Sequence, residues 1–102
     1  MSSHNHPLRL SPEAQKDFSS ILRYTGERWG RKQLLIYRDK LHDALMLIEG
    51  NPALGHHSAE LPTMHRLYFV GSHVIVYRAR QDVIEVVRIL HQRMSISRGV
   101  VE

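Results

Sequence analysis

Cysteine is absent from this chain of 102 residues, which excludes disulfide bonds, thiolate metal sites and a cysteine nucleophile. No apolar run approaches the length of a membrane-spanning helix, and the polar start of the sequence is unlike a secretion signal. Neither a glycine-rich phosphate loop nor a nucleophile elbow occurs. These absences predict a cytoplasmic protein without a membrane segment or a bound cofactor.

Histidine is plentiful, with eight copies, but its spacing does not predict a metal site. His4 and His6 lie in the polar N-terminal segment, and His56 and His57 are neighbours in a loop-like stretch. Neither pair has the spacing that places two ligands on one face of a helix, and no cysteine completes a ligand set. We therefore expect no functional metal.

The size and charge of the chain suit one domain with a charged partner. Hydrophobic residues make up 42% of the sequence, which supports a modest core. The net charge of +4 is uneven: residues 12–50 hold seven Lys/Arg and six Asp/Glu, whereas residues 63–94 hold five Arg and two acids. This surplus in the second half favours nucleic acid or an acidic protein segment as partner, although a merely solvated basic surface gives the same count.

Two helices are predicted for the first half of the chain. A short alternating segment at residues 7–10 indicates an edge strand with proline at its start. Ser11 suits a helix N-cap, and apolar residues recur at spacings of three and four along residues 12–29. A second apolar seam, from Leu34 to Ile48, steps by the same spacings, and only the short join at Trp29–Gly30 separates the two segments. Such a short join predicts an antiparallel helical hairpin.

The second half predicts an antiparallel meander. Residues 51–63 are rich in turn formers, and the three apolar segments that follow are rich in β-branched and aromatic residues. Tight turns separate these segments, which favours antiparallel pairing. The middle segment starts with HVIVY, which is apolar on both faces, so we expect it to be the central strand. The three segments are residues 64–70, 73–80 and 83–90.

The order of these elements predicts an α+β fold, β-α-α-β-β-β, with the helical hairpin packed on one face of a small, mainly antiparallel sheet. A single domain is expected to span residues 7–94. We expect residues 1–6 to be disordered and residues 95–102 to form a flexible tail, because neither segment shows apolar periodicity.

The aromatic residues of the hairpin have two interpretations. Trp29 is the only tryptophan, and we expect it to cover the end of the hairpin as part of the core, since large aromatic side chains usually serve that purpose. The alternative is that Trp29 binds a partner. Tyr24 and Tyr37 are ambiguous in the same way, with a core or rim position favoured.

The arginines of the second half predict a basic surface. Alternate residues of a strand share a face, so Arg78 and Arg80 point the same way and other strand arginines can join them at the rim. The planar fork of arginine suits phosphate and carboxylate groups. Alternatively, Arg88 and His91 only cap the end of the last strand and pair with Glu85 or the chain terminus. The predicted target-contact surface comprises Arg66, Arg78, Arg80, Arg88 and Arg93.

Five segments, taken in order and at this spacing, resemble the ParE toxins of type II toxin–antitoxin systems, within the RelE/ParE superfamily. The resemblance covers about residues 8–94 and implies the fold predicted above. The segments are LSPEAQKDF at 10–18, YTGERWG at 24–30, NPALG at 51–55, ELPTMHRLYFVGSHVIVYR at 60–78 and VVRILHQRM at 86–94.

This resemblance implies a small toxin that inhibits DNA gyrase and is neutralised by a ParD-like antitoxin with a ribbon–helix–helix part. Operator DNA would be contacted only through the antitoxin. We expect the antitoxin to lie across the hairpin, where an acidic amphipathic helix can bury apolar surface. The residues expected to contact it are Tyr24, Trp29, Leu35 and Tyr37.

The alternative within the superfamily is a ribosome-dependent mRNA endoribonuclease like RelE or YoeB. Such an enzyme needs an acid, a base and cations at the cleaved phosphate, and Glu60, Arg66 and His91 loosely resemble the YoeB arrangement. The lysine-rich helix of RelE is missing, however, and no tyrosine follows His91. We therefore expect a non-enzymatic toxin with no catalytic residues.

Overall fold

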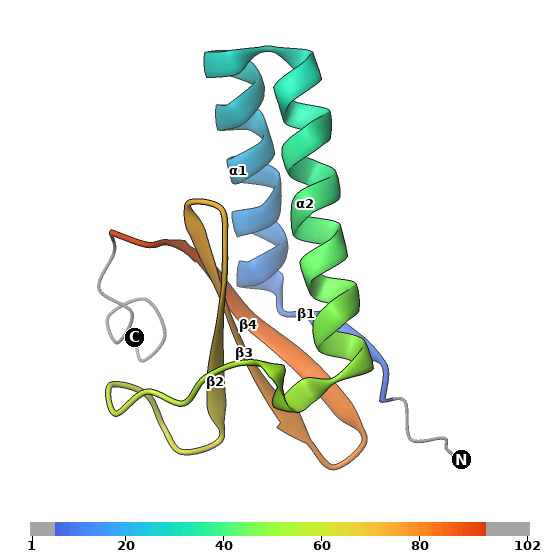
Figure 1. Cartoon of the computed structure of the whole chain (residues 1–102), viewed down its shortest axis with the longest axis vertical. Helices are drawn as coiled ribbons and strands as arrows, with labels where there is room; N and C mark the ends of the chain where they lie inside the picture. Colours follow the sequence, from blue (N-terminus) through green and yellow to red (C-terminus); the bar gives the residue numbers. More distant parts are fainter. Residues whose placement is uncertain (1–5, 94–102) are drawn as a thin grey trace.

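The computed structural model describes residues 6–93, in which two helices pack on one face of a four-stranded sheet (Figure 1). The predicted order and α+β architecture are confirmed. Of the termini expected to lack structure, residues 1–5 and 95–102 lie outside the described residues. The elements are β1 (Leu8–Leu10), α1 (Pro12–Trp29), α2 (Arg31–Gly50), a 3₁₀ turn η1 (Pro52–Leu54), β2 (His65–Val70), β3 (His73–Arg80) and β4 (Val83–His91).

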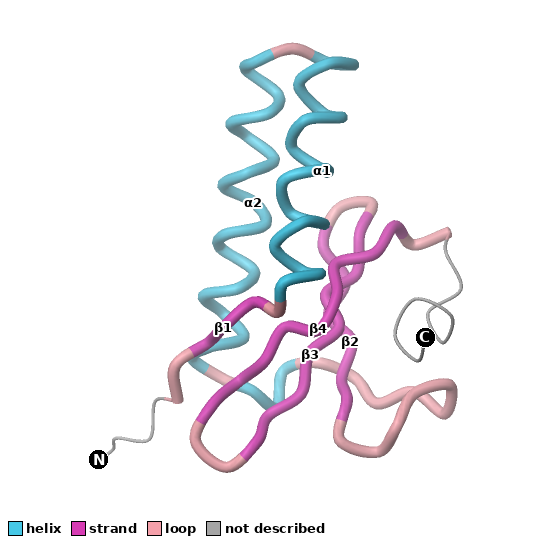
Figure 2. Tube along the Cα trace, turned by 180° about the vertical axis from the view of Figure 1, so that it is seen from behind, coloured by secondary structure: helices cyan, strands magenta, loops and turns pink. Residues whose placement is uncertain are grey.

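The sheet has the strand order β1-β4-β3-β2, and Figure 2 shows the short first strand running beside the last one. The pair β1/β4 is parallel, whereas β2/β3 and β3/β4 are antiparallel, so the predicted meander is confirmed. The register shifts between β3 and β4, where Val76 and Tyr77 face Arg88 and Val86. Val87 is therefore the extra residue of a β-bulge.

Ser11 begins α1 and also ties it to the sheet. Its hydroxyl accepts a hydrogen bond from the Ala14 N–H (3.0 Å), as the predicted N-cap requires, and donates to the carbonyl oxygen of Val87 at the bulge (2.8 Å). The Ser11 N–H donates to the Val86 carbonyl (2.9 Å). One residue thus fixes both the start of the helix and its position against β4.

Gly30 is the only residue between the two helices, which confirms the short join predicted at Trp29–Gly30. Its φ of 94° lies in the region that favours glycine, and its N–H donates to the Gly26 carbonyl while its own carbonyl accepts from Leu34. The chain therefore reverses within one residue, and α1 and α2 run antiparallel.

Both faces of the sheet are covered by apolar side chains. The seam of α2, including Leu41, Ala44 and Ile48, packs with Ile75 and Tyr77 on one face. A second cluster on the other face consists of Leu61, Leu67, Val74, Val76 and Leu90. Four consecutive residues of β3, from Val74 to Tyr77, are fully buried, which confirms that HVIVY forms an interior strand.

The loop after α2 is anchored by the hydroxyl of Tyr77. This hydroxyl accepts a hydrogen bond from the Gly55 N–H and donates to the Pro52 carbonyl oxygen, each at 2.8 Å. Tyr77 is fully buried, and its bond with the Gly55 N–H is buried as well. Gly55 is required here because an added Cβ would lie 2.6 Å from the hydroxyl oxygen.

The far half of the hairpin extends beyond the sheet (Figures 1 and 2). None of residues 22–40 is buried, whereas both helices bury residues near the strands, such as Ala14 and Ile48. Between residues 6 and 93, neither helix is apolar enough to span a membrane.

Candidate partner-binding surface

Trp29 lies exposed at the end of α1, so the expectation that it belongs to the core is wrong. Its side chain is 63% exposed and that of Tyr24 is 60% exposed. The physical reason is the projection of the hairpin beyond the sheet, which leaves no layer for these rings to pack beneath. The Trp29 ring is instead stacked on the Arg28 guanidinium, whose carbon lies 5.4 Å from the ring centroid.

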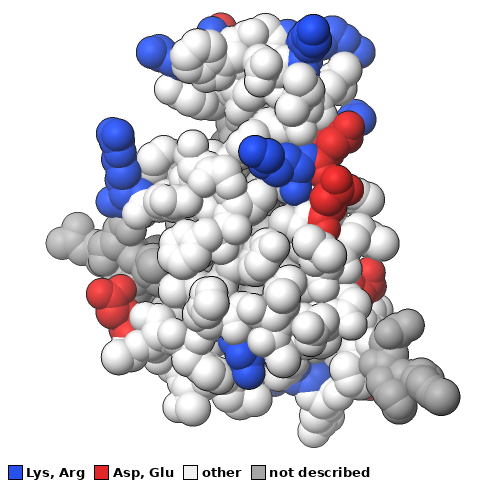
Figure 3. Space-filling model, in the orientation of Figure 1, with Lys and Arg blue, Asp and Glu red and all other residues white. Residues whose placement is uncertain are grey.

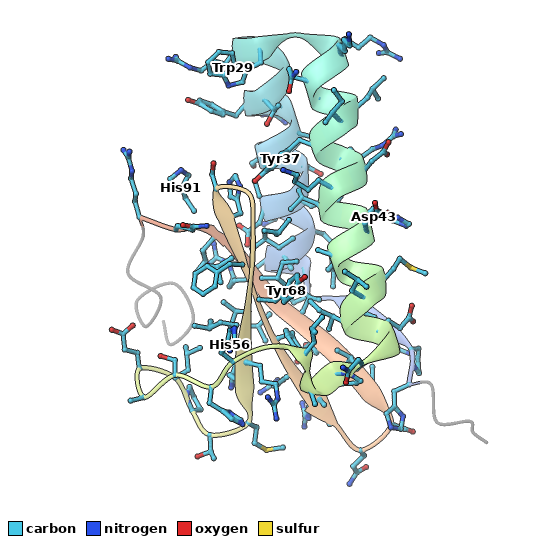
Figure 4. The ribbon with its side chains drawn as sticks, in the orientation of Figure 1. Trp29, Tyr37, Asp43, His56, Tyr68 and His91 are labelled. Carbon is cyan, nitrogen blue, oxygen red and sulfur yellow. The ribbon has the colours of Figure 1, made fainter. Side chains whose placement is uncertain are left out.

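Three of the four residues expected to bind an antitoxin line one depression of about 350 Å³, which we call the aromatic pocket. Tyr24, Trp29 and Tyr37 line it from the hairpin, and His73 and His91 line it from the start of β3 and the end of β4. Figure 4 labels Trp29, Tyr37 and His91. The full lining is Tyr24, Thr25, Trp29, Gln33, Tyr37, Ser72, His73 and His91.

Two residues that line the aromatic pocket, Tyr37 and His73, form a hydrogen-bonded pair. The Tyr37 hydroxyl lies 2.6 Å from His73 Nδ1 and accepts from the Ser72 N–H at 3.1 Å, and the His73 ring meets His91 edge-on with centroids 5.3 Å apart. Burial raises the pKa of the Tyr37 hydroxyl, while burial and nearby His91 lower the pKa of His73 below its usual 6.5. Both groups are therefore uncharged at neutral pH.

Gly71 allows the turn between β2 and β3 to approach Tyr37. Its φ is 56°, and an added Cβ would lie 2.6 Å from the Tyr37 hydroxyl oxygen and 2.7 Å from a ring carbon. The turn and the hairpin thus fit together only with glycine at this position.

Leu35 does not line the aromatic pocket. It precedes Tyr37 by two residues, which places it about 200° around a helix with 3.6 residues per turn. A second depression, of about 420 Å³, instead follows α2 along the edge strand β2, and we call it the edge groove. Its lining is Ile36, Asp39, Lys40, Asp43, Ala44, Leu47, Tyr68, Phe69 and Val70.

The edge groove was missed by the sequence prediction. Ile36, Leu47 and Phe69 are each about half exposed, although all three are large and apolar. The pattern that could have revealed it is the excess of apolar residues in α2, because Ile36 and Leu47 lie outside the buried seam that packs on the sheet. Figure 3 shows an area without charged side chains on this face, bordered by acidic and basic side chains.

The predicted basic surface is largely engaged in bonds within the chain. Arg66 donates from Nη1 to the Gly55 carbonyl (2.8 Å) and the Ala53 carbonyl (3.3 Å), which holds the loop after η1. Arg78 forms an ion pair with Glu85, with 2.7 Å between Nη2 and Oε1. The register places Arg66 opposite Tyr77, so Arg66 and Arg78 lie on different faces of the sheet.

Arg88 pairs with Asp17 of α1, so the expected pairing with Glu85 is wrong. The Asp17 carboxylate accepts from Arg88 Nε (2.7 Å), from Arg88 Nη2 (3.0 Å) and from the Ile89 N–H (2.9 Å). These bonds to Asp17 raise the pKa of the Arg88 guanidinium. Arg80 and Arg93 are exposed, and the structure does not bring the five predicted arginines into one patch.

Glu60, Arg66 and His91 do not converge. Arg66 faces Tyr77 at one end of β2, whereas His91 faces His73, four residues further along β3, a separation of about 13 Å in strand rise. Glu60 is exposed in the loop before β2, and His91 Nδ1 accepts from the Arg93 N–H at 3.1 Å. Within the described part of the chain, no three His, Asp or Glu side chains are placed to hold a metal ion.

Comparison with known proteins places this architecture in a family. The model of the family described as "ParE toxin of type II toxin-antitoxin system, parDE" matches residues 8–96. Toxin ParE1 of Caulobacter vibrioides is 36% identical over 89 residues, covering 87% of this chain and 92% of that protein. Toxin ParE1 of Mycobacterium tuberculosis is 37% identical over 92 residues, covering 89% and 94% respectively.

A solved structure agrees in fold. A chain from the chromosomal ParDE TA system of P. aeruginosa superposes with a TM-score of 0.76 at 15% identity, covering 87% of this chain and 98% of that one. At this identity the likeness concerns the fold alone, whereas the family match and the two relatives extend over most of the sequence. The hairpin, the sheet and the sequence therefore agree, and this chain belongs to the ParE toxin family of type II toxin–antitoxin systems.

Proposed function

We propose that this ParE-family toxin inhibits DNA gyrase in the cytoplasm and is neutralised by a ParD-like antitoxin that covers the aromatic pocket and the edge groove. Membership in the family supports the toxin role. The observation that carries the antitoxin site is the exposure of Trp29, Tyr24 and Phe69 around two neighbouring depressions. Large exposed apolar side chains around a concave surface are typical of protein interfaces.

The chemistry of this surface suits an amphipathic helix. Apolar side chains of the antitoxin would enter the edge groove beside Ile36 and Leu47, and one would reach the aromatic pocket beside Trp29 and Tyr37. A segment that becomes ordered on binding offsets its loss of entropy by burying apolar surface, and a stable complex would bury about 1,600 Å². Leu35 lies outside both linings, so its contribution is expected to be smaller.

The antitoxin site is tested by Trp29→Ala, with Met64→Ala as the matched control. Both side chains are more than 60% exposed, but Met64 lies before β2 and lines neither depression. Trp29→Ala should weaken antitoxin binding about thirtyfold in titration calorimetry, as expected for an aromatic hot spot, and leave the far-UV circular dichroism unchanged. Equal affinities for the two variants would refute the site.

The target is tested by adding the purified toxin to two assays. We expect inhibition of supercoiling by DNA gyrase and no cleavage of mRNA in a translation extract. The separation of Glu60, Arg66 and His91 supports the non-enzymatic proposal, because acid–base cleavage needs these groups within hydrogen-bond reach of one phosphate. The converse result would favour an endoribonuclease. Operator DNA is proposed to be contacted only through the antitoxin's ribbon–helix–helix part.

A further inference from the structure

The hairpin has a strongly basic end that the overall charge count conceals. Residues 23–32, which we call the hairpin tip, hold four Lys/Arg and one Asp/Glu, whereas acidic residues predominate in the rest of the two helices. Figure 3 shows Lys and Arg side chains gathered where α1 meets α2. The four basic residues are all exposed, and no ion pair within residues 6–93 involves them: Arg23, Arg28, Arg31 and Lys32.

The same tip carries the most exposed aromatic rings of the hairpin. Arg28 follows Tyr24 by four residues, so the two side chains are neighbours on one face of α1. The guanidinium of Arg28 also lies over the Trp29 ring. Cationic and aromatic groups therefore interleave along one strip of exposed surface.

The lining of the tip distinguishes between two kinds of acidic partner. An acidic amphipathic helix needs a groove of aliphatic side chains in which to bury its apolar side, whereas the depression at the tip is lined by Tyr24, Glu27, Arg28 and Trp29, none of which is aliphatic. Single-stranded nucleic acid is bound by flat aromatic rings that stack on its bases and by cations that contact its phosphates. Such stacking does not depend on which base is present. Duplex DNA keeps its bases stacked on one another and leaves such rings unused.

We propose that the hairpin tip binds single-stranded nucleic acid, with Trp29 and Tyr24 stacking on bases and Arg28, Arg31 and Lys32 contacting phosphates. The proposal goes beyond the toxin function and does not depend on gyrase being the target. Tyr24 and Trp29 also line the aromatic pocket. An antitoxin seated there would therefore compete with nucleic acid for the same rings.

The single tryptophan provides a direct readout. Trp29 is the only tryptophan in the chain, and its emission is quenched when a base stacks on the indole. Titration of the full-length protein with an oligothymidine of about ten nucleotides should give saturable quenching. The logarithm of the affinity should fall with the logarithm of salt concentration with a slope of about −2 to −3, as expected for release of counterions from three to four phosphates. A duplex of equal length should bind at least about tenfold more weakly.

Substitutions can distinguish the contribution of base stacking to affinity from the contribution of positive charge. The triple variant R28A/R31A/K32A should lose at least about tenfold in affinity, whereas the control R80A/R93A, which removes exposed arginines elsewhere, should lose less than about twofold. Tyr24→Ala should lose about tenfold at unchanged salt slope, since it removes a stacking ring and no charge. Trp29→Ala has no tryptophan whose emission could report binding, so its affinity is measured by the fluorescence anisotropy of a labelled oligonucleotide.

Three results would overturn the proposal. One is the absence of quenching at low salt by a protein whose circular dichroism shows it to be folded. Another is equal loss of affinity in the triple variant and its control. The third is binding of polyglutamate as tightly as oligothymidine, which would identify an acidic polypeptide as the partner. Because only toxin and oligonucleotide are present, failure here leaves the results with gyrase and antitoxin unaffected.

Discussion

The hydrogen bonds and ion pair of Asp17 should stabilise the folded protein more than those of most aspartates near a protein surface. Its side chain is 16% exposed and that of Arg88 is 26% exposed, and the carboxylate accepts three hydrogen bonds. Hydrogen bonds to charged groups contribute about 1.5–3 kcal/mol each, but partial exposure and the better helix propensity of alanine reduce the loss. We expect Asp17→Ala to lower the free energy of unfolding by about 2–3 kcal/mol.

The assay is urea denaturation followed by circular dichroism at 222 nm, applied to Asp17→Ala, Arg88→Ala and the double variant. With an m value of about 1.5 kcal/mol/M, Asp17→Ala should lower the urea midpoint by about 1.5 M. Arg88→Ala alone should lower the free energy of unfolding by less than Asp17→Ala does, because Asp17 keeps its hydrogen bond from the Ile89 N–H. The double variant should be more stable than the sum of the single losses predicts, by at least about 1 kcal/mol.

Asp39→Ala is the matched control for this cycle. Asp39 also lies in a helix and pairs with an arginine, Arg38, but both side chains are at least half exposed. Exposed pairs contribute about 0–1 kcal/mol, so the control should change stability by less than about 0.5 kcal/mol. An equal loss for Asp17→Ala and Asp39→Ala, or strict additivity of the Asp17 and Arg88 variants, would refute the reasoning.

Three further predictions follow from buried groups and tight turns. Tyr77→Phe leaves the loop after α2 without its anchoring hydroxyl and should lower the free energy of unfolding by about 1–3 kcal/mol, measured in urea. Burial and a nearby arginine lower the pKa of His65 below 6.5, so the unfolded chain binds the proton more readily. The contribution of neutral His65 to stability is complete above pH 6.5 and is lost as the pH falls below that value. The free energy of unfolding should therefore differ between about pH 7.5 and about pH 5.5, and this difference should be smaller in His65→Leu than in the unmodified protein. Gly71→Ala forces a Cβ against Tyr37 at a positive φ and should lower the melting temperature by several degrees, whereas Gly50→Ala, with no atom within 4 Å, should not.

Features that depend on near neighbours in the chain were predictable from the sequence. The N-cap at Ser11, the short join at Trp29–Gly30 and the meander each follow from a few adjacent residues, and the structure confirms all three. The parallel pairing of β1 with β4 was not predicted, because nothing local to either strand specifies a partner more than seventy residues away.

The surface was harder to predict, since exposure depends on how elements are placed. Trp29 has the spacing of a core residue, but the hairpin is longer than the sheet beneath it, so the ring is exposed. Arg88 has Glu85 nearby in sequence, yet its carboxylate partner is Asp17, which α1 carries to the edge of β4. The aromatic pocket could not be assembled from sequence because its lining comes from both helices, the β2–β3 turn and the end of β4.

The pairing of the first strand with the last has a consequence for synthesis on the ribosome. Leu8–Leu10 is made more than seventy residues before its partner residues, Ile84 to Val86. The seam of the hairpin likewise has no sheet to cover it until β3 and β4 have emerged. Native structure is therefore deferred until β4 has been made, and a nascent chain that stops before Val83 cannot close the sheet.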